Sequence, residues 1–451
     1  MKRLVDQKLE SWLNNPDKLP LFVLGARQIG KTYSIKEFGK RNFKNKTIYI
    51  NFLDKNDYYK YLNNMSNPEE IINTIKLISK KPIDTSWLII FDEIQEVNEL
   101  KTSLKNFVDQ ELKYNIICLG SYLGNMLNDK SSFPVGKIER IEMFPLNFEE
   151  FLIASQCEDL IIDIKQMIDK RIAMSQIKHS FLVDLLHKFM IIGGMPRVID
   201  TFLKTKDELK QSKIKEDLII DYQQDIIKYI SNKSDKLKCQ VLYKSIPTFL
   251  AKQNKKIVLS QIDKNARYLN YANAIESLLA TRIVYKINNI NTFSSPLKIH
   301  KNESEFKIYY NDCGFLSANL NQTFNTLENK DNGYIRGSIA ENFALSELAQ
   351  KININNIYYY SYQDNNNNRY EVDFVIEDID GKVIPIEIKY GTNFSIKSLN
   401  NLQSNFPEVN SIIFSSKNFS DNKLTKTFTI PLYAIGFMEY HLNRIEIDTK
   451  K

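Results

Sequence analysis

The octapeptide GARQIGKT, residues 25–32, is the feature that most restricts how this chain can fold. An apolar run at residues 20–24 precedes it, and a segment with a helical pattern at residues 33–38 follows it. Strand, glycine-bounded loop and helix, in this order, form the setting in which the pattern GxxxxGK[ST] binds phosphate. Glycines allow the tight loop, whose backbone N–H groups then point at phosphate oxygens from the start of a helix. The pattern predicts a nucleotide-phosphate site.

The predicted nucleotide-binding residues are the whole loop: Gly25, Ala26, Arg27, Gln28, Ile29, Gly30, Lys31 and Thr32. Lys31 would supply a mobile positive charge, and the Thr32 hydroxyl would be a ligand of Mg²⁺. We expect ATP and Mg²⁺ as cofactors at this site.

A second motif follows at residues 87–93, where the apolar run WLIIF ends in Asp92 and Glu93. Hydrolysis of a β–γ phosphate bond needs charge neutralisation and one positioned water. We predict that Asp92 joins Thr32 in binding Mg²⁺, and that Glu93 orients or deprotonates the water. Ser121, at the end of the next apolar run, would sense the γ-phosphate. The alternative to nucleotide binding is that the glycines form an ordinary turn and the acids merely end a buried strand. Both motifs would then have to occur together without a shared function.

Length and composition set wider limits on the class of protein. The 451 residues exceed one ordinary core and favour two to four domains. A net charge of +7 is compatible with a nucleic-acid partner without requiring one. The four cysteines are scattered with no metal-ligand spacing, and no apolar run is long enough to span a bilayer. These features predict a cytoplasmic protein without a membrane segment.

Alternating strand and helix patterns in residues 1–155 predict a parallel α/β sheet. We expect strands at 20–25, 46–52, 87–92, 115–120 and 138–143, and helices at 31–42, 68–80 and 98–112. Residues 156–232 are expected to be a helical lid or linker, broken at GGMP, 193–196.

Residues 233–310 suggest a winged-helix-like domain. Short helices precede an apolar strand at 282–287, which residues 307–310 would pair with. Lys255, Lys256, Lys264 and Arg267 give this region a basic character, and a helix at 268–279 with these neighbours would contact DNA phosphate if DNA is a partner. A solvated helical lid is the alternative.

Residues 311–451 return to mixed α/β patterns and carry a second set of charged residues. Asp373 lies in one predicted strand, and Glu387 and Lys389 lie in the next, after a turn at Asp380-Gly381. Residues two apart in a strand point to the same side, so the three side chains can share one face. An acid on one strand and Glu-x-Lys on the next is the arrangement of the PD-(D/E)xK nuclease core, where carboxylates bind Mg²⁺ and activate water.

Together these landmarks resemble a family of prokaryotic AAA-type ATPases with a C-terminal nuclease-like domain. The resemblance rests on GARQIGKT, LIIFDEIQ, LGS, FPLNFEEF, GGMP and the EVDF…PIEIK pair. It implies an α/β protein with an additional-strand P-loop core, a helical and winged-helix middle, and a restriction-endonuclease-like end in which Glu341 is the helical acid. The family usually has Gly-Arg before the PLxFxEF segment, whereas this chain has Gly136-Lys137, so an arginine finger there is in doubt; Arg140 and Arg197 remain candidates.

Two functions follow as expectations. The first is an ATP-binding AAA-type protein with Mg²⁺-dependent hydrolysis, joined to a nuclease-like domain that engages nucleic acid or a protein partner. That domain would take a second divalent metal at Glu341, Asp373, Glu387 and Lys389, with cleavage left open. The second is an ATP-dependent regulatory scaffold whose nuclease-fold domain is catalytically silent and serves for docking. Oligomers are compatible with both.

Overall fold

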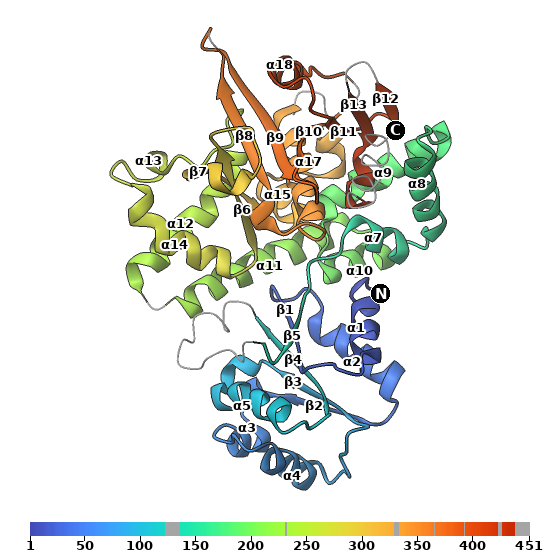
Figure 1. Cartoon of the computed structure of the whole chain (residues 1–451), viewed down its shortest axis with the longest axis vertical. Helices are drawn as coiled ribbons and strands as arrows, with labels where there is room; N and C mark the ends of the chain where they lie inside the picture. Colours follow the sequence, from blue (N-terminus) through green and yellow to red (C-terminus); the bar gives the residue numbers. More distant parts are fainter. Residues whose placement is uncertain are drawn as a thin grey trace. The chain divides into compact units, whose positions relative to one another are not determined.

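Five parallel strands form the first of two sheets in the residues that the structure describes (Figure 1). The computed structural model describes residues 1–121, 136–230, 232–328, 333–364, 366–391, 393–422 and 426–437. These divide into two compact units, the first comprising residues 1–145, 225–232 and 280–282, and the second comprising 146–224, 233–279 and 283–451.

The first sheet has the spatial order β2-β3-β4-β1-β5. Its strands are β1 (Leu21–Gly25), β2 (Thr47–Asn51), β3 (Leu88–Asp92), β4 (Asn115–Ser121) and β5 (Glu139–Glu142). All five lie where the apolar runs predicted strands. Because β4 is inserted between β1 and β3, the GARQIGKT loop and the Asp92-Glu93 pair follow two strands that are separated by one other strand, at the same edge of a parallel P-loop sheet.

Helices cover both faces of this sheet. They are α1 (Val5–Asn14), α2 (Lys31–Phe43), α3 (Asp57–Leu62), α4 (Pro68–Ser79) and α5 (Asn98–Asp109), with short 3-10 turns η1 (Phe52–Asp54) and η2 (Ile94–Glu96). Phe22 and Phe91 pack into one core with the apolar side chains of α4 and α5, whereas the alternate residues of β1, such as Val23, point to the other face. Burial on both faces explains why these strands read as unbroken apolar runs.

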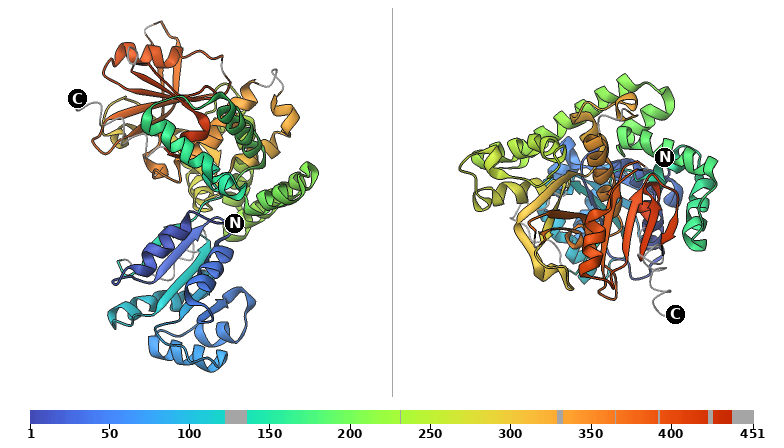
Figure 2. Two further views of the ribbon diagram at one scale, coloured as in Figure 1. Left: turned by 90° about the vertical axis from the view of Figure 1, so that its right-hand side faces the viewer. Right: turned by 90° about the horizontal axis from the view of Figure 1, so that it is seen from above.

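The second unit contains an eight-stranded mixed sheet of order β12-β13-β11-β10-β9-β8-β6-β7, which Figure 2 shows in two further views. Its strands are β6 (Val284–Ile290), β7 (Lys301–Tyr310), β8 (Tyr358–Gln363), β9 (Arg369–Glu377), β10 (Val383–Lys389), β11 (Ser411–Ser415), β12 (Ser420–Asn422) and β13 (Thr427–Pro431). Strand β10 is antiparallel to β9 and parallel to β11.

Helices before, between and after these strands complete the second unit. They are α7 (Phe148–Ala154), α8 (Glu158–Lys170), α9 (Gln176–Ile192), α10 (Pro196–Thr205), α11 (Glu208–Tyr229), α12 (Lys233–Leu250), α13 (Leu259–Ile262), α14 (Tyr268–Ala280), α15 (Cys313–Asn319), α16 (Phe324–Glu328), α17 (Gly333–Leu348) and α18 (Lys397–Asn405). Among the residues described, the 3-10 turns η3 (Leu297–His300), η5 (Ile354–Asn356) and η6 (Leu432–Phe437) lie between or after strands. The last residues of α11 and α14 belong to the first unit.

The winged-helix domain predicted for residues 233–310 is not confirmed. Its expected strand pair is present, since Lys286 lies opposite Ile308 in an antiparallel ladder. This hairpin is, however, the edge of the larger sheet, because β6 also pairs in parallel with β8, where Asn288 lies opposite Tyr358. Buried Ile290 packs in one cluster with Tyr358 and strand β9. The sheet thus continues across residue 310, the boundary expected from the sequence.

The predicted break at GGMP is confirmed, because α9 ends at Ile192 and α10 begins at Pro196. Gly193 has φ +79°, and a Cβ there would lie 2.0 Å from Asp312 Oδ1. At Gly194 a Cβ would lie 2.0 Å from the Leu146 carbonyl oxygen, and its N–H donates to Asp312 Oδ2 at 2.5 Å. The two glycines therefore allow a close backbone crossing that a side chain would block.

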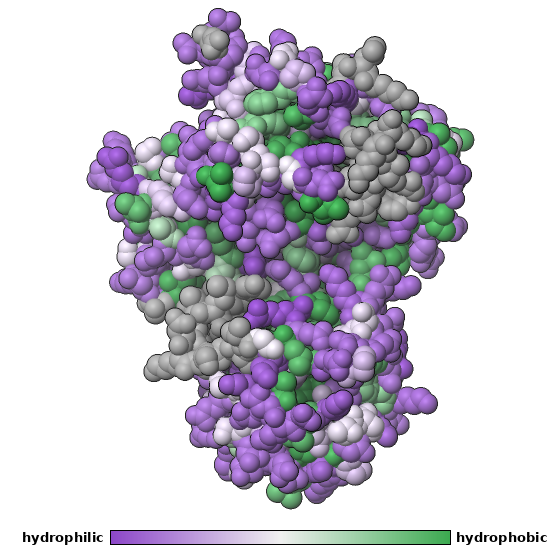
Figure 3. Space-filling view, in the orientation of Figure 1, coloured by the Kyte–Doolittle hydropathy of each residue, from purple (hydrophilic) through white to green (hydrophobic). Residues whose placement is uncertain are grey.

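Hydrophilic residues predominate on the face drawn in Figure 3, and apolar residues form small groups on it. Among the residues described, no helix combines the length and apolar character needed to cross a bilayer.

Candidate functional site

The GARQIGKT loop joins β1 to α2 and is shaped by left-handed backbone at two positions. Gly30, the residue before α2, has φ +92°, and Gln28 has φ +60°. At Gly25 a Cβ would lie 2.4 Å from the Met143 carbonyl oxygen, so only glycine fits there. Arg3 Nη1 donates to the Ile29 carbonyl at 2.9 Å and holds the loop from outside. The sequence therefore forms a tight loop at a helix N-terminus, as its glycines predicted.

Lys31 is the first residue of α2, and its ammonium folds back over the loop. Its Nζ donates to the carbonyl oxygens of Gly25 at 2.9 Å and Ala26 at 2.6 Å. Burial lowers the pKa of Lys31 to about 8, although the carboxylates of Glu93 and Asp92 oppose this shift. A phosphate at the loop would offer this ammonium stronger acceptors than neutral carbonyls.

Thr32 and Asp92 meet at the edge of the sheet. The Thr32 hydroxyl donates to Asp92 Oδ2 at 2.7 Å, and the Tyr49 hydroxyl donates to the same oxygen at 2.8 Å. Tyr49 comes from β2, and its neighbour Asn51 lies opposite Asp92 in the parallel ladder. Two oxygen donors from the loop helix and from β3 therefore lie together beside the Lys31 ammonium, which fits the oxygen ligands and residual water that Mg²⁺ prefers.

Glu93 is half-buried and holds an unusual backbone conformation for a residue with a side chain, at φ +56°. Its N–H donates to Asp92 Oδ1 at 3.0 Å, and Gln95 Nε2 donates to Glu93 Oε2. Non-glycine residues in this region are uncommon and occur at functional sites. Asp92 is thus the last residue of β3, and Glu93 begins the turn that follows it.

Three predicted arginines and Ser121 remain to be placed around the first site. Arg27 Nη1 forms an ion pair with Asp225 Oδ1 at 2.6 Å. The backbone of Ser121 pairs with Gly25 across β4 and β1, and its side chain lies outside the described residues. Arg140 in β5 and Arg197 in α10 are both exposed.

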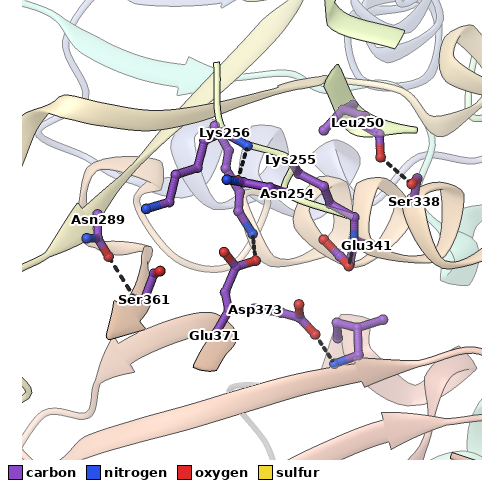
Figure 4. A network of polar contacts seen from close by, with 12 residues as sticks. Leu250, Asn254, Lys255, Lys256, Asn289, Ser338, Glu341, Ser361, Glu371 and Asp373 are labelled. Carbon is purple, nitrogen blue, oxygen red and sulfur yellow. Dashed lines mark hydrogen bonds and ion pairs between the residues drawn. The ribbon is translucent and has the colours of Figure 1, made fainter. Parts of the chain in front are cut away.

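The second set of predicted residues also comes together, in the second unit, and Figure 4 shows two of them, Glu341 and Asp373. Glu341 lies on α17, Asp373 on β9, and Glu387 and Lys389 on β10. The three carboxylates are only 3 %, 8 % and 3 % exposed, in that order. Asp373 Oδ2 accepts a hydrogen bond from the Ile388 backbone N–H at 2.8 Å, and Lys389 forms an ion pair with Glu387 Oε1.

Two further lysines enter this acidic cluster. Lys255, from the loop between α12 and α13, pairs with Glu341 Oε1, while the Tyr309 hydroxyl donates to Glu341 Oε2 at 3.1 Å. Lys307 on β7 pairs with Glu371 Oε1 at 2.6 Å and has no exposed side-chain surface. The cluster therefore contains four carboxylates and three ammonium groups.

The electrostatic consequences differ among the three predicted acids. Burial alone would raise the pKa of Glu341, but the adjacent Lys255 ammonium, with help from Lys307, lowers it. Burial raises the pKa of Asp373 well above its ordinary value, and the charges of Glu341 and Glu387 add to this. Burial also raises the pKa of Glu387 against the opposing effect of Lys389. Lys255 thus favours the ionised form of Glu341, whereas burial disfavours the ionised forms of Asp373 and Glu387.

The second divalent metal expected in this cluster is not shown. Within the described ranges, no group of three or more His, Cys, Asp or Glu side chains is arranged to hold a metal ion. An ammonium group, that of Lys255, lies against the acid that would be the helical ligand. Lys255 and Lys256, expected as DNA contacts, each pair with an acid in this structure, Glu341 and Glu305, and the DNA contacts stay a prediction.

Sequence reasoning assigned no site role to several members of both sites: Tyr49, Gln95, Asp225, Lys255, Lys307 and Tyr309. Gln95 ends the LIIFDEIQ landmark, and no motif marks the other five. Only the basic run at residues 252–256 drew attention to Lys255, and it suggested a solvent-facing surface.

Comparisons with known proteins agree with the first site. Residues 17–152 match the AAA domain family, residues 183–326 match a domain of unknown function (DUF8612), and residues 336–434 match another (DUF4143). An uncharacterized protein of Methanocaldococcus jannaschii is 25 % identical over 375 residues, which cover 80 % of this chain and 72 % of that protein.

Solved structures with some likeness include AMPPCP-bound DnaA of Aquifex aeolicus, with a TM-score of 0.30 and 16 % identity over 61 % of this chain and 86 % of that chain. Another is the ORC1 protein of Aeropyrum pernix in complex with DNA, with a TM-score of 0.28 and 12 % identity over 71 % and 91 %. Scores this low carry no argument about function.

The loop, the acid pair, the strand order and the family match at residues 17–152 define the class of protein. Residues 17–152 form an AAA-type domain with a parallel-sheet P-loop core, which supports ATP binding. The second half of the chain corresponds to domains for which no role is established.

Proposed function

We propose that the chain is a Mg²⁺-dependent ATPase. The observation that carries this proposal is the contact of 2.7 Å between Thr32 Oγ1 and Asp92 Oδ2 at the mouth of a glycine-bounded loop. Thr32 and Asp92 would hold Mg²⁺, which when bound neutralises charge on the phosphate oxygens. Lys31 leaves the loop carbonyls and donates to the β- and γ-phosphates instead.

Glu93 is the residue we assign to the attacking water. It follows Asp92 directly in the chain, so it lies beside the proposed Mg²⁺ ligand Asp92 and is not itself assigned to the metal. Gln95 holds one of its carboxylate oxygens, which leaves the other to accept a proton or orient a water. Ser121 is the γ-phosphate sensor in this proposal, since its backbone lies beside the first residue of the loop.

The experiment compares ATP binding and turnover in three variants of the full chain. Lys31→Ala should abolish binding, because it removes the cation that phosphate requires. Glu93→Gln should bind ATP normally and lose at least about a hundredfold in turnover, the size expected for a general base. Glu96→Gln makes the same chemical change three residues away and should keep wild-type turnover. Equal turnover in wild type and Glu93→Gln would exclude the base assignment.

For the second unit we propose a restriction-endonuclease-like fold. Support comes from the succession α17, β8, β9, β10, α18 and β11, and from the way it gathers one helical acid, one acid on β9 and a Glu-x-Lys pair on β10. Nucleic acid is then the natural partner class, and the exposed Lys264 and Arg267 near α14 remain candidates for phosphate contacts. A DNA-nicking assay with Mn²⁺ tests cleavage, which Lys389→Ala should remove if it occurs.

The alternative is a silent nuclease fold used for docking, with ATP controlling its availability. The ion pair between Lys255 and Glu341 favours this alternative, because it places an ammonium against a carboxylate that catalysis would need free. Salt-dependent DNA affinity distinguishes the two, since phosphate contacts release counterions and a protein-docking surface does not depend on them. An affinity that falls steeply with salt supports the nucleic-acid partner, and the absence of affinity supports docking.

A further inference from the structure

The acidic cluster of the second unit contains one cation that does not belong to the sheet around it. Glu371, Asp373, Glu387 and Lys389 come from β9 and β10, and Lys307 comes from the neighbouring β7. Lys255 instead comes from the loop between α12 and α13, residues 251–258, and Figure 4 shows its side chain reaching Glu341. Its side chain keeps only 15 % of its surface exposed, and that of Glu341 keeps 4 %.

The loop at 251–258 contacts strand β7 and its neighbours beside the cluster. The Ile257 N–H donates to the Phe306 carbonyl at 3.0 Å, and Lys256 pairs with Glu305 at 2.9 Å. Beside the loop, the Ser338 hydroxyl donates to the carbonyl of Leu250, the last residue of α12. Lys255 thus lies on a connection that contributes no strand to the sheet and is anchored two residues later by the buried side chain of Ile257.

The charges of the cluster show what Lys255 contributes. Lys307 and Lys389 each pair with an acid on the sheet itself, Glu371 and Glu387. Among the described residues Glu341 forms its ion pair with Lys255 and not with a sheet lysine, although Lys307 also helps to lower its pKa, and an isolated buried carboxylate is strongly disfavoured. Its charge is compensated by Lys255, so a cation is required at this place and the loop provides it.

One oxygen of the cluster lacks a partner. Glu387 Oε2 is fully buried and forms no hydrogen bond within the part of the chain that the structure describes. Buried carboxylate oxygens are normally satisfied, and an unsatisfied one points to an absent ligand. Together with Asp373 and Glu341, it provides the hard oxygen donors that divalent cations such as Mg²⁺ and Mn²⁺ prefer.

We propose that Lys255 is a built-in counter-ion that occupies the place of a divalent metal at Glu341, Asp373 and Glu387, and that withdrawal of the 251–258 loop converts the cluster into a metal site. This rests on the nuclease-like assignment of the second unit. The loop then acts as an autoinhibitory segment, and any partner that binds residues 251–258 would expose the acids to metal.

The test removes the charge of Lys255 in the full chain and measures Mn²⁺ binding by calorimetry and by thermal melting. Lys255→Met keeps the length and apolar stem of the side chain, and Lys255→Gln is a second neutral variant that keeps a donor for Glu341. Lys255→Arg preserves the charge, and Lys256→Met removes the neighbouring charge that pairs with Glu305. Any Mn²⁺ bound by Thr32 and Asp92 is common to all variants and cancels.

The expected result is an additional equivalent of Mn²⁺ in Lys255→Met and Lys255→Gln only. Metal at about ten times Kd should raise the melting temperature of these variants by about 3–6 °C more than that of wild type. Asp373→Asn in the same background should cancel this gain, whereas Lys255→Arg and Lys256→Met should behave like wild type.

Two other results would overturn the proposal in different ways. Mn²⁺ binding by wild type that Asp373→Asn removes would mean that the metal site exists and Lys255 does not block it. No Mn²⁺ binding in either neutral variant would mean that the acids form no metal site, which also rejects the nuclease-like chemistry. Neither result affects the ATPase, which is measured on the same preparations through Glu93→Gln.

Discussion

The affinity for ATP should depend on pH through Lys31. Its ammonium is buried against loop carbonyls, and burial lowers its pKa to about 8 in the nucleotide-free protein. Phosphate binding requires the charged form, so ATP raises this pKa. The sign follows: affinity is highest below pH 8, where Lys31 is already protonated, and it falls above pH 8, where binding must first add a proton.

The size of the effect follows from the same pKa. With a pKa of about 8, the charged fraction of Lys31 falls from about three quarters at pH ~7.5 to about 3 % at pH ~9.5. The dissociation constant for ATP should therefore rise about 25-fold over this range, which corresponds to about 1.9 kcal/mol. Phosphate groups complete their ionisation near pH ~6 and do not contribute. Burial raises the pKa of Tyr49 beyond the range, so the phenol beside Asp92 does not interfere.

The assay is titration with ATP and Mg²⁺ at several pH values, followed by calorimetry. Lys31→Arg is the matched control, because a guanidinium remains charged throughout the range. This variant should bind ATP less well than wild type, with an affinity nearly constant across the range. A flat profile for wild type, or the same decline in Lys31→Arg, would refute the assignment of Lys31 as the buried phosphate ligand.

Two further predictions concern stability. Burial raises the pKa of Glu347, which accepts a hydrogen bond from the Phe148 N–H at 2.8 Å, to about 8. Between pH 4.5, the ordinary pKa of a glutamate, and pH 8, Glu347 is ionised in the unfolded chain but protonated in the folded one, so the wild type loses stability as pH rises. Glu347→Gln cannot ionise, so its free energy of unfolding in urea should rise relative to wild type by up to about 1.4 kcal/mol per pH unit in this range. Gly193→Ala, which forces a Cβ against Asp312, should cost more than about 1 kcal/mol in thermal melts, whereas Gly337→Ala inside α17, with open space around it, should be neutral or stabilising.

The first sheet was largely predictable from the sequence because its information is local. Each strand is an apolar run, as β3 (Leu88–Asp92) illustrates, and the loop and acid pair lie at strand ends where any parallel sheet would gather them. Neighbours from other strands were not predictable. Tyr49 reaches Asp92 only because β2 pairs with β3 in one register, and nothing in the residues around Tyr49 encodes that register.

The second unit shows the opposite limit. The β6–β7 hairpin was predicted from nearby residues, yet its role depends on the distant partner Tyr358 on β8. Likewise, Lys255 in a basic run suggested a solvated surface, since charge runs normally face water. The fold instead brings Lys255 against the buried carboxylate of Glu341. Only this close approach lets the attraction between the two charges offset the hydration that the ammonium loses.

The ribosome synthesises all strands of the first sheet well before it synthesises the last strand of the second. The last strand of the first sheet, β5, ends at Glu142, whereas the second sheet lacks a strand until β13 ends at Pro431. The intervening stretch takes about 15–60 s to synthesise at usual elongation rates. A ribosome-bound chain therefore carries a finished GARQIGKT loop while strand β6 still has an unpaired edge, the kind of edge that chaperones cover and that drives aggregation when they do not.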